Sequence, residues 1–167
     1  ALTRATSSSS GASAVKLVLI GPIRDEGLYE SLKSRESDSF MIHEEVSRAL
    51  LLEAIAEADV VVNTSVSEGM SSALLEAMAA ETLVIARDIP ANRELLVGPA
   101  SSSLGCGILF QSPEDFVSVT KNIFQKDQEE RRARLIQNAK SLLLKRHTQD
   151  QECASYREIV DRLVDAN

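Results

Sequence analysis

Short apolar runs that alternate with amphipathic stretches are the feature that most constrains the fold of this 167-residue chain. The first run, VKLVLIG (residues 15–21), is continuously apolar and is followed by Pro, as is typical of a strand buried on both faces. Such strands are joined by helices that cover both faces of a parallel sheet. The sequence therefore predicts an α/β domain with a doubly wound, Rossmann-like parallel sheet. We expect strands at 15–21, 40–43, 58–63, 82–86 and 107–110, and helices at 27–35, 44–58, 71–81, 113–125, 128–146 and 150–166.

The N-terminal segment ALTRATSSSSGASA (residues 1–14) is rich in Ser and Ala and carries almost no large apolar side chain. This composition is typical of a flexible tail. We therefore predict that residues 1–14 lie outside the fold and that one domain occupies residues 15–167.

The charge of the chain limits its partners. A formal net charge of −7 and a pI near 4.9 argue against a nucleic-acid surface, which needs clustered Lys and Arg. No apolar run approaches the ~18 to 20 residues that span a bilayer. We predict a cytoplasmic protein without a nucleic-acid partner or a membrane span. Because residues 1–14 hold one Arg and no acid, an organelle-targeting role for this segment stays open.

The sequence predicts no metal site and no cofactor. Cys106 and Cys153 are far apart and lack a second Cys or His at metal-binding spacing. Free thiols in a reducing compartment are the favoured interpretation, and a single disulfide between the two remains open. His43 and His147 also lack a neighbour at metal-ligand spacing.

The stretch NTSVSEGMSSALLEAMA (residues 63–79) carries two glutamates, Glu68 and Glu76, with seven residues between them. Local helix chemistry does not explain the second one. A capping box needs Glu or Gln three residues after its Ser or Thr, and that position holds Leu whether the count begins at Ser71 or at Ser72. Glu76 is therefore a candidate for ligand binding.

This stretch follows a predicted strand and opens a helix, which is where a doubly wound sheet meets its ligands. The backbone at Gly69 allows a close approach, and the free N–H groups near Ser71 and Ser72 form an anion site with the helix dipole. Glu76, one turn further on, is suited to accept hydrogen bonds from hydroxyl groups such as a ribose diol. The pattern indicates a site for a phosphorylated, hydroxyl-bearing ligand.

Residues 57–79, EADVVVNTSVSEGMSSALLEAMA, resemble the nucleotide-sugar site of the retaining GT-B glycosyltransferases of group 1 (family 4), whose hallmark is Glu-x7-Glu after a strand. LVIARDIPANRELL (83–96) and GILF (107–110) resemble the segments that follow in that family. The resemblance implies that residues 15–167 form the donor-binding, C-terminal half of a GT-B fold.

The resemblance also implies roles for individual residues. Glu68 would act catalytically beside the donor sugar, where its carboxylate supports positive charge that develops at the anomeric centre. Glu76 would bond the donor ribose. The remaining donor-binding positions would be Gly69, Met70, Ser71 and Ser72, which line the diphosphate and sugar, and His43 and Val46, which fall near the base-binding loop.

Glu94 has two open interpretations. The family carries a donor-side Glu at this place, whereas an acid in the first turn of a helix also has its own electrostatic reason.

The chain departs from the family pattern in three places. Residues 79–84, AAETLV, lack the Gly and Pro that the family has between helix and strand, and Thr64 stands where Pro is usual. Residues 15–21 align with the second strand of this half, so we expect the family's first strand–helix unit, with its phosphate-binding Arg and Lys, to be absent. We expect the acceptor-binding N-terminal domain to be absent too. An exposed sheet edge beside residues 15–21, open to self-association, would follow.

The predicted function is transfer of a sugar from a nucleoside-diphosphate sugar to an unknown acceptor, with retention and without an obligatory metal. Residues 1–167 alone are expected to be inactive, because the acceptor must be held against the donor. Two alternatives stay open. In the first, the chain is a non-catalytic nucleotide-sugar-binding or regulatory module. In the second, it belongs to an epimerase of GT-B fold that acts on the nucleotide-sugar alone.

Overall fold

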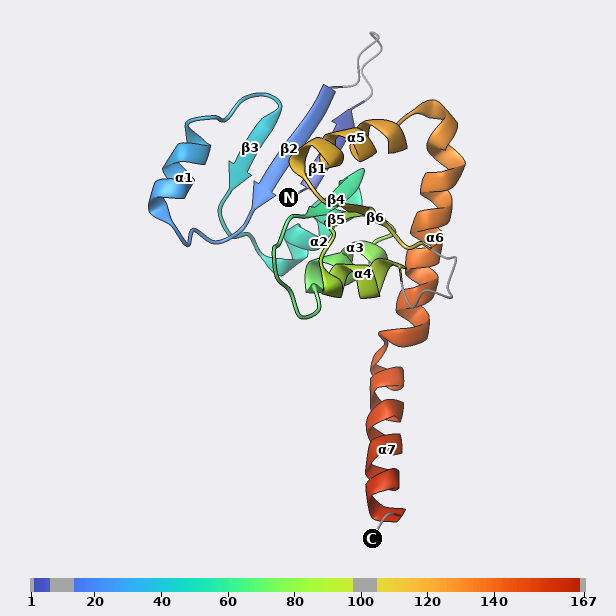
Figure 1. Cartoon of the computed structure of the whole chain (residues 1–167). Helices are drawn as coiled ribbons and strands as arrows, with labels where there is room; N and C mark the ends of the chain where they lie inside the picture. The colour runs from blue at the N-terminus through green and yellow to red at the C-terminus, as the bar shows by residue number, and fades with distance from the viewer. Residues whose placement is uncertain (1, 7–13, 98–104, 166–167) are drawn as a thin grey trace.

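A computed structural model describes residues 2–6, 14–97 and 105–165 of the chain. They form a six-stranded sheet in the order β3-β2-β1-β4-β5-β6, with helices on both faces (Figure 1). The strands are β1 Leu2–Thr6, β2 Ala14–Ile20, β3 Phe40–His43, β4 Val60–Asn63, β5 Leu83–Arg87 and β6 Ile108–Phe110. The helices are α1 Glu26–Lys33, α2 Arg48–Glu57, α3 Ser72–Ala79, α4 Pro90–Val97, α5 Pro113–Ile123, α6 Glu129–Arg146 and α7 Gln149–Asp165, with a short 3-10 turn at Lys126–Gln128.

The five predicted strands are confirmed, and they all run in one direction. β2 pairs with β3 in parallel, and β4, β5 and β6 pair in parallel with one another. β1 lies between these two groups and is antiparallel to β2 and to β4, so the two groups point the same way. The carboxyl ends of β2 to β6 therefore meet at one edge of the sheet, where a doubly wound fold binds its ligands.

The prediction that residues 1–14 form a tail outside the fold is wrong for Leu2–Thr6, which is a strand of the sheet; residues 7–13 lie outside the described residues. This strand pairs with β2 from Leu2↔Val18 to Thr6↔Ala14. Without it, β2 and β4 would each present unpaired backbone groups in the middle of the sheet, which is costly when buried. The predicted open edge beside residues 15–21 is thus occupied by β1, and self-association through that edge is not what the structure indicates.

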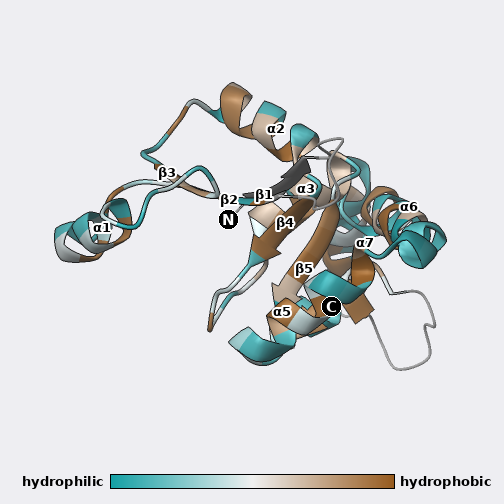
Figure 2. Cartoon of the chain, turned by 90° about the horizontal axis from the view of Figure 1, so that it is seen from above, coloured by the Kyte–Doolittle hydropathy of each residue, from teal (hydrophilic) through white to brown (hydrophobic). Residues whose placement is uncertain are grey.

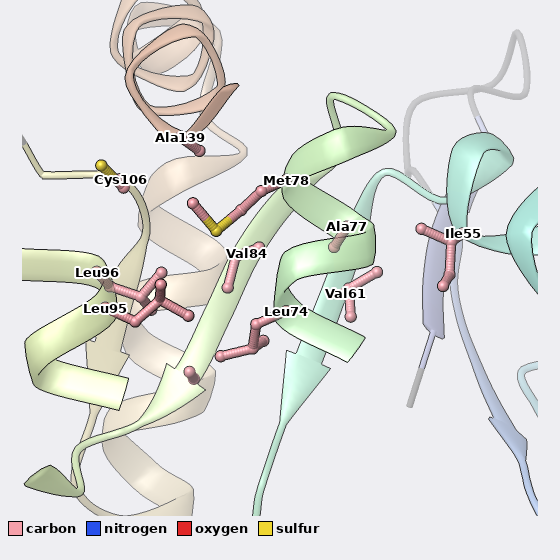
Figure 3. Close-up of a cluster of buried hydrophobic side chains, with 11 residues drawn as sticks. Ile55, Val61, Leu74, Ala77, Met78, Val84, Leu95, Leu96, Cys106 and Ala139 are labelled. Carbon is pink, nitrogen blue, oxygen red and sulfur yellow. The ribbon is translucent and has the colours of Figure 1, made fainter. Parts of the chain in front are cut away.

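The core lies on both faces of the sheet, because alternate residues of a strand point to opposite sides. Figure 2 shows the apolar β4 and β5 between α3 and α6 on one side and α5 on the other. The first cluster of buried side chains, shown in Figure 3, packs under α2, α3, α4 and α6, and its members are Ile55, Val61, Leu74, Ala77, Met78, Val84, Ala86, Leu95, Leu96, Cys106 and Ala139. The second packs under α5 and comprises Val60, Val62, Leu83, Ile85, Ile108, Phe110 and Ile123. β4 and β5 are therefore rigidly held, and so is the edge at which they end.

The C-terminal cap of α3 contains Glu81, which stands where the resembling family has Gly. Thr82 N–H donates to Ala77 O at 2.9 Å and Glu81 N–H donates to Met78 O at 3.3 Å, which are the two bonds of a Schellman cap. This cap needs a left-handed residue at its centre, and Glu81 adopts it with φ of 58°. Glu81 therefore carries a steric cost at the position where the resembling family has Gly.

Replacing Glu81 with Gly is expected to stabilise the domain by about 1 kcal/mol, because Gly removes the Cβ clash of the left-handed conformation. The ion pair of Glu81 with Lys140 would be lost, but its two side chains are 55% and 45% exposed, and exposed pairs contribute little. Thermal unfolding should show a rise of roughly 2–4 °C. Glu81→Ala is the matched control, since it also breaks the pair but keeps Cβ. Equal melting temperatures for the two variants would contradict the explanation.

The C-terminal helix α7 extends away from the sheet (Figure 1). Each of its side chains that the structure describes is exposed. Cys106 and Cys153 are not joined by the disulfide that the sequence left open: Cys153 lies exposed on α7, and burial raises the pKa of the Cys106 thiol. Across the described ranges, no cluster of His, Cys, Asp or Glu could hold a metal ion, and no helix is long and apolar enough to cross a bilayer.

Candidate functional site

The candidate site lies where β4 ends. β4 finishes at Asn63, a loop follows, and α3 begins at Ser72. Glu68 and Gly69 lie in this loop and Glu76 lies on α3, as the sequence predicts. The buried valines of β4 fix one end of the loop, and Leu74, which is 0% exposed, fixes the start of the helix.

Asn63 connects the parts of the loop. Its amide nitrogen donates to Glu68 Oε1 at 3.2 Å and to Ser71 Oγ at 3.1 Å. Its amide oxygen accepts from the Ser65 backbone N–H at 3.1 Å and from Asn92 Nδ2 at 3.4 Å. The side chain of Asn63 therefore links the strand end, the loop carboxylate, the first residue before α3 and the helix α4.

Ser71 stands at the N-cap of α3 but does not cap it with its side chain. Ser71 is 6% exposed, and its Oγ accepts a hydrogen bond from the Asn63 amide instead of from a backbone N–H of the first helical turn. A helix start of this kind leaves its first N–H groups to water or to a ligand. The arrangement suits an anion at the start of α3.

Glu76 is mostly buried and forms an ion pair with Arg48 of α2. Its Oε1 lies 2.9 Å from a guanidinium nitrogen of Arg48, and the two side chains are 17% and 75% exposed. Helix α2 begins at Arg48, four residues later than the sequence predicted, because Ser47 accepts from the Leu50 N–H at 3.3 Å and caps the helix there. Val46, one of the predicted base-loop residues, lies two residues before Arg48 and is half-buried.

Gly69 and Met70 line a cavity of about 130 Å³ together with Glu94 of α4 and with Arg146 and His147 at the end of α6. Met70, Arg146 and His147 also line a neighbouring cavity of about 610 Å³ that extends along α7. Glu94 is not in the first turn of α4, so its helix-start interpretation is wrong. Positive charge from Arg146 thus lies beside the loop.

His43 lies elsewhere. It ends β3 and lines a cavity of about 240 Å³ that also contains Pro22, Arg24 and Tyr29. Neither Glu68 nor Glu76 is among the residues that line this cavity. His43 is also not among the residues that line the cavity at Gly69 and Met70.

Sequence reasoning missed the residues that hold the two glutamates. Asn63 was visible as a polar residue that ends a run of three valines, whereas Asn92 lies on α4, a helix that the sequence analysis did not predict. Asn92 is 1% exposed and donates to Arg87 O at 2.9 Å. Nothing in the local pattern around Arg48, Arg146 or His147 distinguished them from solvated charges at helix ends.

The sheet order, the parallel strands and the polar loop at their carboxyl edge define a Rossmann-like domain with a ligand site after its central strand. Residues 3–142 match the family model described as Glycosyl transferases group 1, and the chain belongs to this family. It is 32% identical over 148 residues to the protein named Glycosyltransferase 1 domain-containing protein 1 from Xenopus tropicalis. That match covers 87% of this chain and 41% of the relative's length.

Two solved glycosyltransferase structures share the fold. The catalytic domain of starch synthase IV from Arabidopsis thaliana, bound to ADP and acarbose, matches with a TM-score of 0.67 at 21% identity. HepE from Anabaena, in complex with UDP and glucose, matches with a TM-score of 0.67 at 16% identity. Each match covers 90% of this chain, and 32% and 40% of the respective structure. The chain has the fold of the C-terminal half of a GT-B glycosyltransferase and spans less than half the length of these relatives.

Proposed function

We propose that the protein to which this domain belongs transfers a sugar from a nucleoside-diphosphate sugar to an acceptor hydroxyl with retention of anomeric configuration. The bond between the anomeric carbon and the diphosphate oxygen breaks, and the nucleoside diphosphate leaves with the bonding electrons. The acceptor oxygen bonds to the anomeric carbon on the same face, and the acceptor's proton leaves with the diphosphate. The observation that carries the proposal is the loop after β4, in which Asn63 holds Glu68 next to the uncapped start of α3.

Each part of the site has a task in this reaction. The α3 start and the backbone of residues 69–72 bind the diphosphate, because N–H groups and the helix dipole favour negative charge there. Glu76 accepts hydrogen bonds from the ribose hydroxyls. Glu68, whose Oε1 is engaged by Asn63, offers its other oxygen to the positive charge that develops at the anomeric carbon.

The first strand–helix unit of the resembling family supplies an Arg and a Lys to the phosphates, and here β1 takes the place of that strand. We assign the compensating charge to the α3 start and to Arg146, which lines a cavity with Gly69 and Met70. No metal ion has a task in this arrangement. Val46 and His43 remain proposed neighbours of the base.

The experiment is turnover of UDP-glucose, ADP-glucose and GDP-mannose by the full-length protein, with water as the acceptor. We expect release of the nucleoside diphosphate from one of them, and a free sugar that first appears in the donor's own α configuration. A product of inverted configuration would contradict retention. Interconversion of the nucleotide-sugar without release would favour the epimerase, and binding without turnover would favour the binding module. Residues 1–167 alone are expected to transfer no sugar to an acceptor, since holding the acceptor against the donor is worth roughly 7 to 11 kcal/mol.

A further inference from the structure

The side chain of Asn63 uses its full hydrogen-bonding capacity. A primary amide has two donor hydrogens and two acceptor lone pairs. In Asn63 the donors go to Glu68 Oε1 and Ser71 Oγ, and the acceptors take Ser65 N–H and Asn92 Nδ2–H. A side chain with four such bonds has no freedom to rotate without breaking one of them.

The orientation of this amide is fixed by groups whose polarity is unambiguous. The Ser65 N–H can only donate, so it must face the amide oxygen of Asn63. Asn92 donates to the backbone carbonyl of Arg87, which can only accept, so the same nitrogen faces the oxygen of Asn63 as well. Asn92 is itself buried, at 1% exposure. Because Ser65 and Asn92 both donate to the amide oxygen of Asn63, its amide nitrogen must point the other way, toward Glu68.

We propose that Asn63 is a positioning residue for the sugar transfer: it holds the Glu68 carboxylate in one orientation toward the donor sugar. The inference rests on the proposed function, since it assigns Asn63 a part in the chemistry of Glu68. A carboxylate on a loop would otherwise turn toward water. Catalysis by preorganised charge requires that the group be in place before the positive charge appears. Ser71 accepts the second N–H of the same amide, so the loop carboxylate and the start of α3 are set relative to each other by one side chain.

A purely structural role makes a different prediction. The bond from Ser65 N–H to the Asn63 oxygen is that of an Asx turn, which Asp forms equally well. Asp at this position would also accept from Asn92. Asn63→Asp therefore preserves the turn and the tie to α4, and it removes only the two donors while adding a negative charge beside Glu68.

The test uses the full-length protein and whichever of UDP-glucose, ADP-glucose or GDP-mannose the wild type turns over. Asn63→Asp is expected to lower kcat by about tenfold or more, as for loss of a hydrogen bond to a charged group. The dissociation constant of the free nucleoside diphosphate should rise by a smaller factor than kcat falls, because the ribose contact and the backbone N–H groups of the anion site are intact and only the added charge opposes the diphosphate. Asn138→Asp, which removes a 3.1 Å bond from another amide to Gly105 O, is the matched control and should leave kcat unchanged.

A double-mutant cycle separates positioning from stability. If Asn63 acts through Glu68, Asn63→Asp should have little further effect on kcat when Glu68 is already Gln. Additive losses in the double variant, an unchanged kcat in Asn63→Asp, or a parallel loss of nucleotide affinity would each overturn the proposal. A wild type that turns over none of the three donors would overturn the proposed function at the first step, before any variant is compared, and the inference with it.

Discussion

Glu68→Gln in the full-length protein is expected to lower the turnover of the nucleotide-sugar by about 10² to 10³-fold, while the affinity for the nucleoside diphosphate stays nearly the same. The neutral amide keeps the size of the side chain but removes the negative charge that we propose faces the anomeric carbon. A preorganised electrostatic contact of this kind is worth roughly 2.7 to 4 kcal/mol in the transition state. The measurement is kcat from nucleoside-diphosphate release, together with the dissociation constant from calorimetric titration.

Glu53→Gln is the matched control for this variant, because Glu53 is an exposed glutamate on α2. Its kcat should equal that of the wild type. A Glu68→Gln enzyme with full turnover would remove Glu68 from the chemistry. If affinity and turnover fell by the same factor, Glu68 would be a ground-state binding residue and not a group that stabilises the transition state.

The strands of the sheet were predictable because their sequence signal is local. β4 and β5 are buried on both faces, so each reads as a continuous apolar run, and the side chains of Val60, Val61 and Val62 are all buried. The order of helices and strands then predicts the doubly wound fold. The position of the site follows from the same signal, since it is the loop after such a strand.

The strand β1 was not predictable from its own residues. LTRAT is short and polar, and nothing in it distinguishes a strand from a tail. Its place is set by the gap between β2 and β4, which belong to segments far apart in the chain. Pairing that depends on two distant segments is not encoded in the local sequence of β1, so it can be recognised only in the assembled sheet.

The partners of the two glutamates were missed for the same physical reason. Glu68 and Glu76 lie in one stretch and their spacing is readable, but Arg48 reaches Glu76 from α2, and Asn92 reaches Asn63, the partner of Glu68, from α4. Asn63 is within the stretch, yet its role appears only when Asn92 is seen to fix its amide. The sequence pattern singles out Glu68 and Glu76 as candidates, whereas the side chains that contact them are determined by tertiary packing.

The ion pair between Arg48 and Glu76 leads to the second large prediction. Glu76→Ala is expected to weaken the binding of a nucleoside diphosphate about tenfold or more, because a hydrogen bond to a charged group is worth roughly 1.5 to 3 kcal/mol. UDP and ADP titrated calorimetrically into the full-length protein test this. The corresponding 2′,3′-dideoxy nucleotides, which lack the hydroxyls that Glu76 would accept from, should bind the wild type and Glu76→Ala with the same affinity.

Arg48→Ala should act in the opposite direction, because Arg48 already holds one oxygen of the Glu76 carboxylate and a ribose must compete with it. Arg48 is 75% exposed, and an exposed ion pair contributes about 0 to 1 kcal/mol, so the gain in affinity should not exceed about fivefold. High salt, which screens this pair, should shrink the difference between Arg48→Ala and the wild type. If Arg48→Ala instead weakened binding as much as Glu76→Ala, Arg48 would itself be a ligand of the nucleotide. If the dideoxy nucleotides lost affinity in Glu76→Ala as the ribonucleotides do, Glu76 would support the fold of the site and not bind the ribose.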